Sequence, residues 1–305
     1  MTIPKVSVVC PIYNRADYIR DTVDSLLAQD LDSFEIVLIN DGSPDPRVRE
    51  ILDSYDDPHL KVVHQENTGF TLAIRRAIEL SHAPFIAIQG AGDVSLPSRL
   101  RLQWEALEAA PGAAIAGCHY RVRNMLDGVV SEVAPVLPAK GTIIFQRLSH
   151  GELMYRRSVY DAVKGYRTVF NVGQGSDLWM RLMREHTAVI IPSVEYEQRY
   201  FADGTALSPV KRVMRHVMNA VRIENERLFR QTGFDHIDSY GAGAFGMLGG
   251  SWTVRRETAR AILGLELLGK AACGSRIEAD ALTRGIVVLL RIYRALRGRR
   301  TDFMR

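Results

Sequence analysis

Four strand-like segments, each followed by a segment with helical spacing, constrain the fold more than any other feature of the sequence. The strand-like segments are rich in valine and isoleucine, and the helical ones place apolar residues three and four positions apart, as Ile19, Val23 and Leu26 do. The pairs are residues 5–10 with 17–29, 34–39 with 46–55, 60–64 with 69–80, and 85–89 with 97–109. Repeated units of this kind form a parallel sheet with right-handed crossovers and helices on both faces. The sequence therefore predicts an α/β, Rossmann-like fold whose ligand loops share one edge of the sheet.

The regular alternation ends near residue 113. The segments that follow predict strands at 114–120, 129–133, 141–145, 188–191 and 196–200, and short helices at 157–163 and 176–185. After Leu207 the pattern is helical and basic, with a glycine-rich interruption at 241–250. We therefore predict a mixed sheet that completes one domain at 1–207, followed by a helical C-terminal region at 208–305.

Net charge, cysteine spacing and the distribution of apolar residues exclude several classes of protein. The 305 residues carry a formal net charge of +4, which suits phosphate-bearing ligands or an anionic membrane surface better than nucleic acid, so no nucleic-acid partner is expected. The cysteines, Cys10, Cys118 and Cys273, have neither disulfide nor zinc-site spacing. No signal-peptide pattern opens the sequence, and no apolar run approaches the roughly 18 residues of a membrane span. These features predict a cytoplasmic protein.

Five separated segments share one resemblance. They are residues 6–15, 35–43, 69–78, 177–182, and 199–201 with 204–208. In order and spacing they resemble the family 2 glycosyltransferases, which have the GT-A fold. The resemblance implies an inverting enzyme that moves a sugar from a nucleotide-sugar donor to a hydroxyl of a glycan or lipid-linked glycan.

The loops after the first two strands are the candidate nucleoside site. A nucleotide base needs a flat contact and a hydrogen-bond partner for its edge, and Tyr13 and Asp41 offer these at the ends of adjacent strands. The resemblance assigns the same role to Pro11, Tyr13, Asn14 and Asp41. Turns that merely end two strands are the alternative.

The loop after the fourth strand lacks the acids that the resemblance implies. Members of the family hold a divalent metal on an Asp-x-Asp motif, and that metal neutralises the departing diphosphate. When the loop is aligned with the family motif on Pro97, the two acidic positions are Gly90 and Gly92, and Asp93 is the acid that remains. A single carboxylate holds Mg²⁺ or Mn²⁺ poorly, although Mg²⁺ can use one carboxylate together with substrate phosphates. We therefore predict Gly92 and Asp93 at the diphosphate, with Asp93 as the one candidate metal ligand.

Arg75 is a candidate replacement for the metal. It stands on the third helix, where relatives usually have asparagine, and a guanidinium binds phosphate oxygens bidentately. The alternative is a solvated helix residue.

The acceptor side also lacks an expected acid. The resemblance places the catalytic base in a Glu-Asp pair that reads Gln174 and Gly175 here. The remaining candidates are Asp177, which could equally be a helix-start carboxylate, and Glu152, which lies beside His150.

Residues 281–305 hold seven arginines and one aspartate, with apolar residues at helical spacing. Such a helix suits peripheral contact with an anionic membrane, or it packs on the catalytic domain with its arginines in solvent. Because acids are missing at two places, a rival to the enzyme is a catalytically silent GT-A domain that binds a glycan or a partner. A nucleotidyltransferase ranks last, because it would still need acids for its metal.

Overall fold

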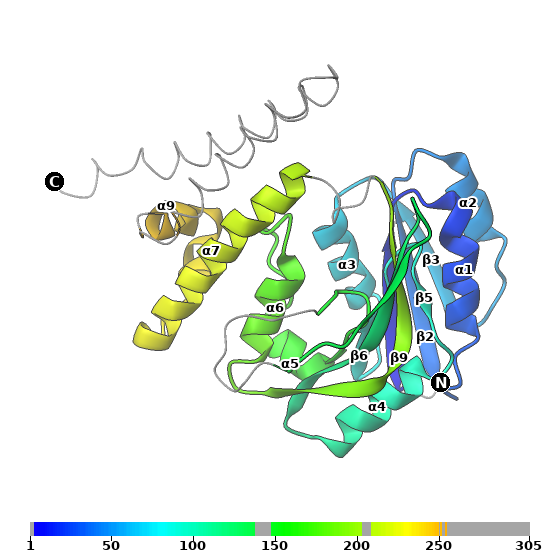
Figure 1. Cartoon of the computed structure of the whole chain (residues 1–305), viewed down its shortest axis with the longest axis horizontal. Helices are drawn as coiled ribbons and strands as arrows, with labels where there is room; N and C mark the ends of the chain where they lie inside the picture. The colour runs from blue at the N-terminus through cyan, green and yellow to red at the C-terminus, as the bar shows by residue number, and fades with distance from the viewer. Residues whose placement is uncertain (1–2, 138–147, 203–208, 250, 252–253, 255–305) are drawn as a thin grey trace. The chain divides into compact units, whose positions relative to one another are not determined.

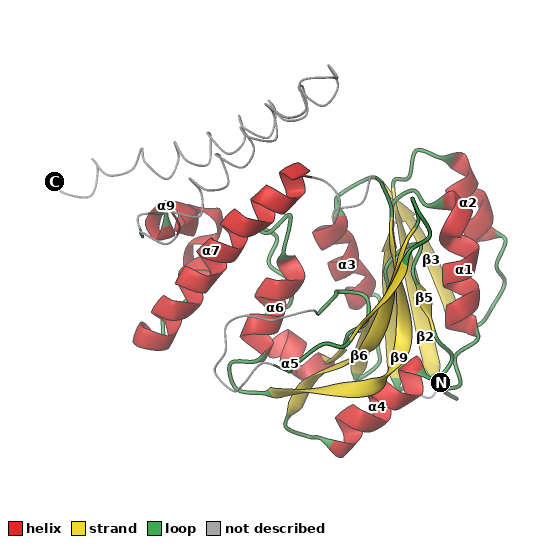
Figure 2. Ribbon diagram, viewed as in Figure 1, coloured by secondary structure: helices red, strands yellow, loops and turns green. Residues whose placement is uncertain are grey.

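The computed structural model describes residues 3–137, 148–202, 209–249, 251 and 254. The chain divides into two compact units, one ending at Phe201 and the other beginning at Ala202. The first unit contains the sheet, and Figures 1 and 2 show its helices on either side of the strands.

Among the described residues, nine strands form one mixed sheet in the order β3-β2-β1-β4-β8-β6-β9-β5, with β7 paired to β6. The strands are β1 Val6–Ile12, β2 Phe34–Asp41, β3 Leu60–Gln65, β4 Phe85–Ile88, β5 Val94–Ser95, β6 Ala113–Asn124, β7 Val130–Val133, β8 Met154–Arg156 and β9 Thr187–Tyr200. The helices of this unit are α1 Ala16–Leu27, α2 Pro46–Asp53, α3 Phe70–Glu79, α4 Arg99–Ala109, α5 Arg157–Ala162 and α6 Gln174–Leu182. Strands β1 to β4 run parallel, whereas β8 is antiparallel to β4. The carboxyl ends of β1, β2 and β4 and the amino end of β8 therefore share one edge.

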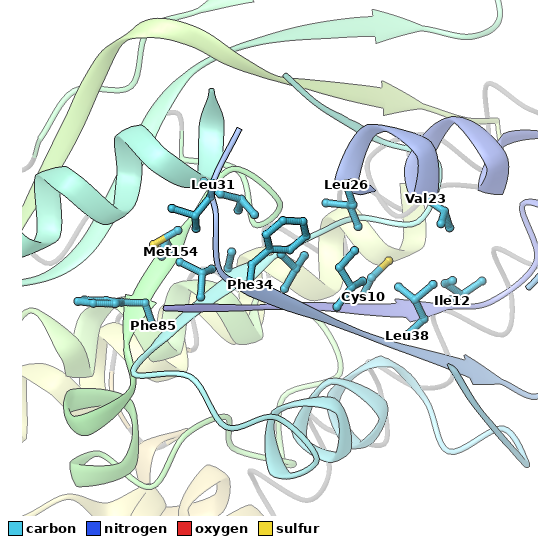
Figure 3. Close-up of a cluster of buried hydrophobic side chains, with 14 of the residues drawn as sticks. Cys10, Ile12, Val23, Leu26, Leu31, Phe34, Leu38, Phe85 and Met154 are labelled. Carbon is cyan, nitrogen blue, oxygen red and sulfur yellow. The ribbon is translucent and has the colours of Figure 1, made fainter. Parts of the chain in front are cut away.

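Helices cover both faces of the sheet, as the sequence predicts. Alternate β1 residues Val6, Val8 and Cys10 pack with α1, α2 and α4, whereas Val9 packs with α3, α5 and α6. Figure 3 shows the first of these layers, with Val23 and Leu26 of α1 above Cys10 of β1. Because successive side chains of a strand point to opposite faces of the sheet, β1 contributes apolar residues to the cores on both faces.

Pro11 does not end the first strand, which continues to Ile12. The Val9 carbonyl accepts a bond from the Gln89 amide, so Val9 and Pro11 both direct their backbone polar groups toward β4. Strand β4 stops at Ile88, which pairs with Val9, so the missing N–H of Pro11 faces a position where no ladder bond is required.

Two further details differ from the sequence prediction. The short strands β5 and β8 were not predicted, because segments of two or three residues carry no alternation. Residues 187–200 form one strand rather than two, since a register shift opposite Cys118 and His119 accommodates Pro192. The predicted strand at 141–145 lies outside the described residues.

The described part of the second unit is helical. It consists of α7 Pro209–Thr232, α8 His236–Tyr240, a 3-10 turn at Gly241–Gly243 and α9 Ala244–Leu248. The basic segment 281–305 lies outside the described residues. Within the described ranges, we find no helix that is both long and apolar enough to span a membrane.

Candidate active site

Three loops meet at the edge where β1, β2 and β4 end. Ile12 pairs with Asn40 in the parallel ladder, so Tyr13 follows β1 beside Asp41 of β2. The Asn14 amide donates to Ser43 Oγ at 2.9 Å, which ties the first two loops together. The third loop joins them because Thr22 Oγ1, on α1, donates to the Asp93 carbonyl at 2.8 Å.

Asp41 organises this edge. Its Oδ1 accepts from the Thr68 amide at 2.8 Å and from Gln65 Nε2 at 2.7 Å, and its Oδ2 accepts from the Gly69 amide at 2.9 Å. The carboxylate is almost fully buried. Oδ2 makes one of these bonds only, and a carboxylate oxygen can accept two, so it retains the capacity to bind the edge of a base.

Gly42 explains why glycine follows Asp41. Its φ is +67°, and a Cβ there would lie 2.5 Å from the Asn67 amide nitrogen. Glycine therefore permits both the left-handed turn and the approach of the loop that binds Asp41.

Tyr13 and Asn14 offer complementary surfaces at the same edge. Tyr13 is 49% exposed, so its ring face is open to a planar ligand. Asn14 has a φ of +61°, and its Oδ1 is buried without a hydrogen-bond partner among the described residues. Such an orphaned acceptor is costly unless a ligand donates to it.

Asp93 is buried among the sheet residues that surround it. Its Oδ2 accepts from the Tyr196 hydroxyl at 2.6 Å, and its Oδ1 accepts from the Arg199 amide at 2.8 Å. Burial raises the pKa of Asp93 to about 6, against these hydrogen bonds, which lower it. Gly90 makes room for this pair, because a Cβ at Gly90 would collide with Asp93 Oδ2 and lie 3.2 Å from Tyr196 Oη.

Gly92 makes room for a different contact. Its φ is +93°, and a Cβ there would lie 2.8 Å from Phe201 Cζ and 3.6 Å from Arg15 Cδ. The Arg15 guanidinium lies 4.3 Å from the centre of the Phe201 ring.

A divalent metal does not fit these residues. Both oxygens of Asp93 accept protein hydrogen bonds, and the spaces beside Gly90 and Gly92 hold other side chains. Among the described residues, no group of three or more His, Cys, Asp or Glu side chains is arranged to hold a metal ion. These residues therefore do not form a site for a divalent metal.

Arg75 lies farther along α3. Its Nη1 donates to the Tyr166 carbonyl at 2.9 Å, which ties α3 to the segment between α5 and α6. This contact does not bring Arg75 together with Tyr13, Asp41 and Asp93.

The two predicted acceptor-side carboxylates are both buried. Asp177 pairs with Arg181 at 2.7 Å and with Arg167 at 3.1 Å, so both of its oxygens face guanidinium groups. Glu152 is fully buried, its Oε1 accepts from the Ser149 amide, and burial raises its pKa to about 8. A base must reach the hydroxyl it deprotonates, and these surroundings favour structural roles for both carboxylates.

His150 lies at the place that Gly175 leaves open. A Cβ at Gly175 would lie 3.1 Å from His150 Cδ2, and the imidazole packs against Phe70 with ring centres 5.3 Å apart. Phe70 is the first residue of α3 and follows Gly69, whose amide binds Asp41. His150 is therefore next to the edge that holds Asp41, and its side chain is half-buried.

A hydrogen-bonded group of aromatic side chains fixes the imidazole. His150 Nε2 bonds with the Tyr166 hydroxyl at 2.5 Å, and Trp179 Nε1 donates to the Tyr155 hydroxyl at 2.7 Å in the same cluster. Burial lowers the pKa of His150 to about 4. The ring is consequently neutral near pH 7 and can accept a proton.

The fold is shared with solved glycosyltransferases of GT-A type. A mannosyltransferase from Pyrobaculum calidifontis, solved with GDP-Man and Mn²⁺, superposes with a TM-score of 0.56 at 20% identity, covering 97% of this chain and 85% of that one. TarS 1–349 of S. aureus, solved with UDP-GlcNAc, gives a TM-score of 0.58 at 16% identity, covering 96% and 91%. At these identities the likeness shows the fold, and it confirms the predicted GT-A architecture.

The sequence comparison is more specific. The profile of glycosyl transferase family 2 matches residues 7–164, and the chain belongs to this family. It is 29% identical over 192 residues to the putative glycosyltransferase EpsE of Bacillus subtilis, covering 60% of this chain and 68% of that protein. The chain covers only 28% and 31% of the length of two other bacterial relatives that it matches.

Proposed function

We propose that this protein transfers a sugar from a nucleotide-sugar to a hydroxyl of a glycan or lipid-linked glycan, with inversion and without a divalent metal. The single observation that carries the proposal is the intact nucleoside edge, where the loops of Tyr13, Asn14 and Asp41 are hydrogen-bonded together. Family membership supports the reaction class. A cytoplasmic location is part of the same proposal.

The donor would bind with its base at Tyr13 and Asp41. The exposed ring of Tyr13 offers a stacking surface, and Asp41 Oδ2 and the orphaned Asn14 Oδ1 both accept hydrogen bonds. A base or ribose that donates N–H or O–H groups satisfies these acceptors.

His150 is the base in this proposal, in place of Asp177 and Glu152. When His150 Nε2 donates to Tyr166, the lone pair is on Nδ1, which takes the proton of the acceptor hydroxyl. The hydroxyl oxygen then bonds to the anomeric carbon as the bond from that carbon to the diphosphate oxygen breaks, and the diphosphate leaves with the electron pair. A pKa of about 4 gives His150 a basicity close to that of a carboxylate, so the neutral form is present throughout the physiological range.

Calorimetric titration with UDP, GDP and dTDP, each in EDTA and in MnCl₂, tests the proposal. We expect at least one diphosphate to bind, with an affinity that differs less than threefold between the two conditions. Hydrolysis of the matching nucleotide-sugar then reports turnover even when the acceptor is unknown. Absence of binding to all three would contradict the enzyme and support the catalytically silent module.

A further inference from the structure

The space beside Gly92 contains a positive charge where the resemblance implies a negative one. A Cβ at Gly92 would touch the Phe201 ring, and the next side chain it meets is the Arg15 stem, 3.6 Å away. The guanidinium of Arg15 continues from that stem over the Phe201 ring. An arginine and an aromatic ring together thus fill the volume that an acidic side chain at position 92 would occupy.

A comparison of charges shows how the Arg15 guanidinium could substitute for a metal ion held by two acids. Gly90 and Gly92 remove the two negative charges that a divalent cation would balance, and Arg15 places one positive charge beside Gly92. A diphosphate that approaches this edge meets a cation in both cases, but here the cation is covalently attached. A guanidinium stacked on a ring uses its face for the ring and its N–H edge for phosphate oxygens.

The backbone directs Arg15 to this place. Asn14 and Arg15 have φ values of +61° and +75°, and consecutive left-handed conformations are unfavourable for residues other than glycine. The Arg15 carbonyl accepts from the Tyr18 and Ile19 amides, so this turn also begins α1. The turn reverses the chain after β1 and brings the Arg15 side chain against the Gly92 loop.

We propose that Arg15 binds the donor diphosphate and takes the place of the metal, a role that we do not assign to Arg75. This inference rests on the proposed function and specifies how its phosphate subsite works. Phe201 and Gly92 act as positioning residues, since the ring supports the guanidinium and the glycine leaves room for it.

Substitution of Arg15 tests the inference. Arg15→Gly removes the guanidinium and is suited to the positive φ, so the fold should be retained, which a thermal unfolding curve verifies. Arg15→Lys keeps the positive charge but loses the pair of guanidinium N–H groups that can bind two phosphate oxygens at once. Arg20→Ala removes an exposed charge from α1, the helix that follows Arg15, and serves as a matched control, while Arg75→Ala tests the competing residue.

Calorimetry with UDP, GDP and dTDP, and with the corresponding nucleosides, separates the outcomes. In EDTA we expect Arg15→Gly to weaken the bound diphosphate by about 10- to 100-fold and the nucleoside by less than about threefold. Arg15→Lys should fall between Arg15→Gly and the unmodified protein, and the Arg20→Ala and Arg75→Ala proteins should bind within about twofold of it.

Two results would overturn the role of Arg15 while leaving glycosyl transfer intact. The first is an Arg15→Gly protein that binds the diphosphate within twofold of the unmodified protein. The second is a tenfold or greater gain in affinity when MnCl₂ replaces EDTA. Failure of the unmodified protein to bind any of the three diphosphates would instead defeat the proposed function, and this inference with it.

Discussion

The two halves of the candidate site differ in how they relate to the sequence motifs. At the nucleoside half, Asp41 and the loop after β1 lie together, held by backbone amides. At the phosphate and acceptor half, glycines stand where acids are implied, and Arg15, Phe201 and His150 lie beside them. The contrast indicates that the first half keeps the residues that the resemblance implies for nucleoside binding, while the second lacks the acids that it implies for the metal and the base.

The largest effect should come from His150, which tests the acceptor half. We expect His150→Ala to lower kcat by about 100- to 1,000-fold while donor affinity changes less than threefold, because a general base acts on the reaction and not on donor binding. Steady-state turnover and calorimetry measure the two quantities. His59→Ala, at an exposed histidine, is the control, and an unchanged kcat in His150→Ala would exclude this base.

The next largest effect should come from Asp41, at the nucleoside half. Asp41→Asn presents an amide to the Thr68 and Gly69 N–H groups, so we expect nucleoside and diphosphate affinity to fall together by about 10- to 100-fold. Asp17→Asn, at an exposed carboxylate, should change neither. If Asp41→Asn weakened diphosphate binding and left nucleoside binding unchanged, the proposed contact of Asp41 with the nucleoside would be wrong.

A stability measurement tests whether Gly90 really faces a filled space. Gly90→Ala should reduce the free energy of unfolding by about 2 to 4 kcal/mol, since its Cβ would collide with Asp93 and disturb the bond to Tyr196. Gly112→Ala is the matched control, because a Cβ there meets nothing within 4 Å. Urea denaturation of both proteins gives the comparison, and equal stabilities would mean that the space beside Gly90 is open.

The last prediction concerns Glu152, whose effect on stability appears only as a function of pH. Its pKa is about 8 in the folded protein, above its value of 4.5 when unfolded, so the native state binds the extra proton and stability falls as pH rises between these values. Glu152→Gln removes the ionisable group and, with it, this pH-dependent contribution to the free energy of unfolding. Its stability relative to the unmodified protein should therefore rise by about 2 to 4 kcal/mol from pH 5 to pH 8.

Urea titrations at several pH values measure this difference, and Glu79→Gln, at an exposed carboxylate, should show none. Taking the difference between proteins cancels the titrations of Asp93 and His150, which shift in opposite directions. A flat difference would mean that Glu152 ionises freely, and it would return this carboxylate to consideration as a base.

The sequence by itself determined the parallel half of the sheet, the helices that cover it and the edge where Tyr13 and Asp41 lie. Alternation in residues 5–10 and helical spacing in 17–29 are local, and the carboxyl ends of parallel strands always meet at one edge. The sequence therefore predicts that Tyr13 and Asp41 lie close together.

Only the tertiary structure decided what replaces the missing acids. His150, Gly175 and Phe70 come from three segments, as do Arg15, Gly92 and Phe201, and no local pattern reports which side chains meet across such distances in the chain. Asp177 and Glu152 have the side chain that a base needs, yet arginine partners hold Asp177, and burial raises the pKa of Glu152. The sequence gives the type of each residue, but the pKa and the accessibility of a side chain depend on burial and on neighbouring groups, which only the packed structure defines.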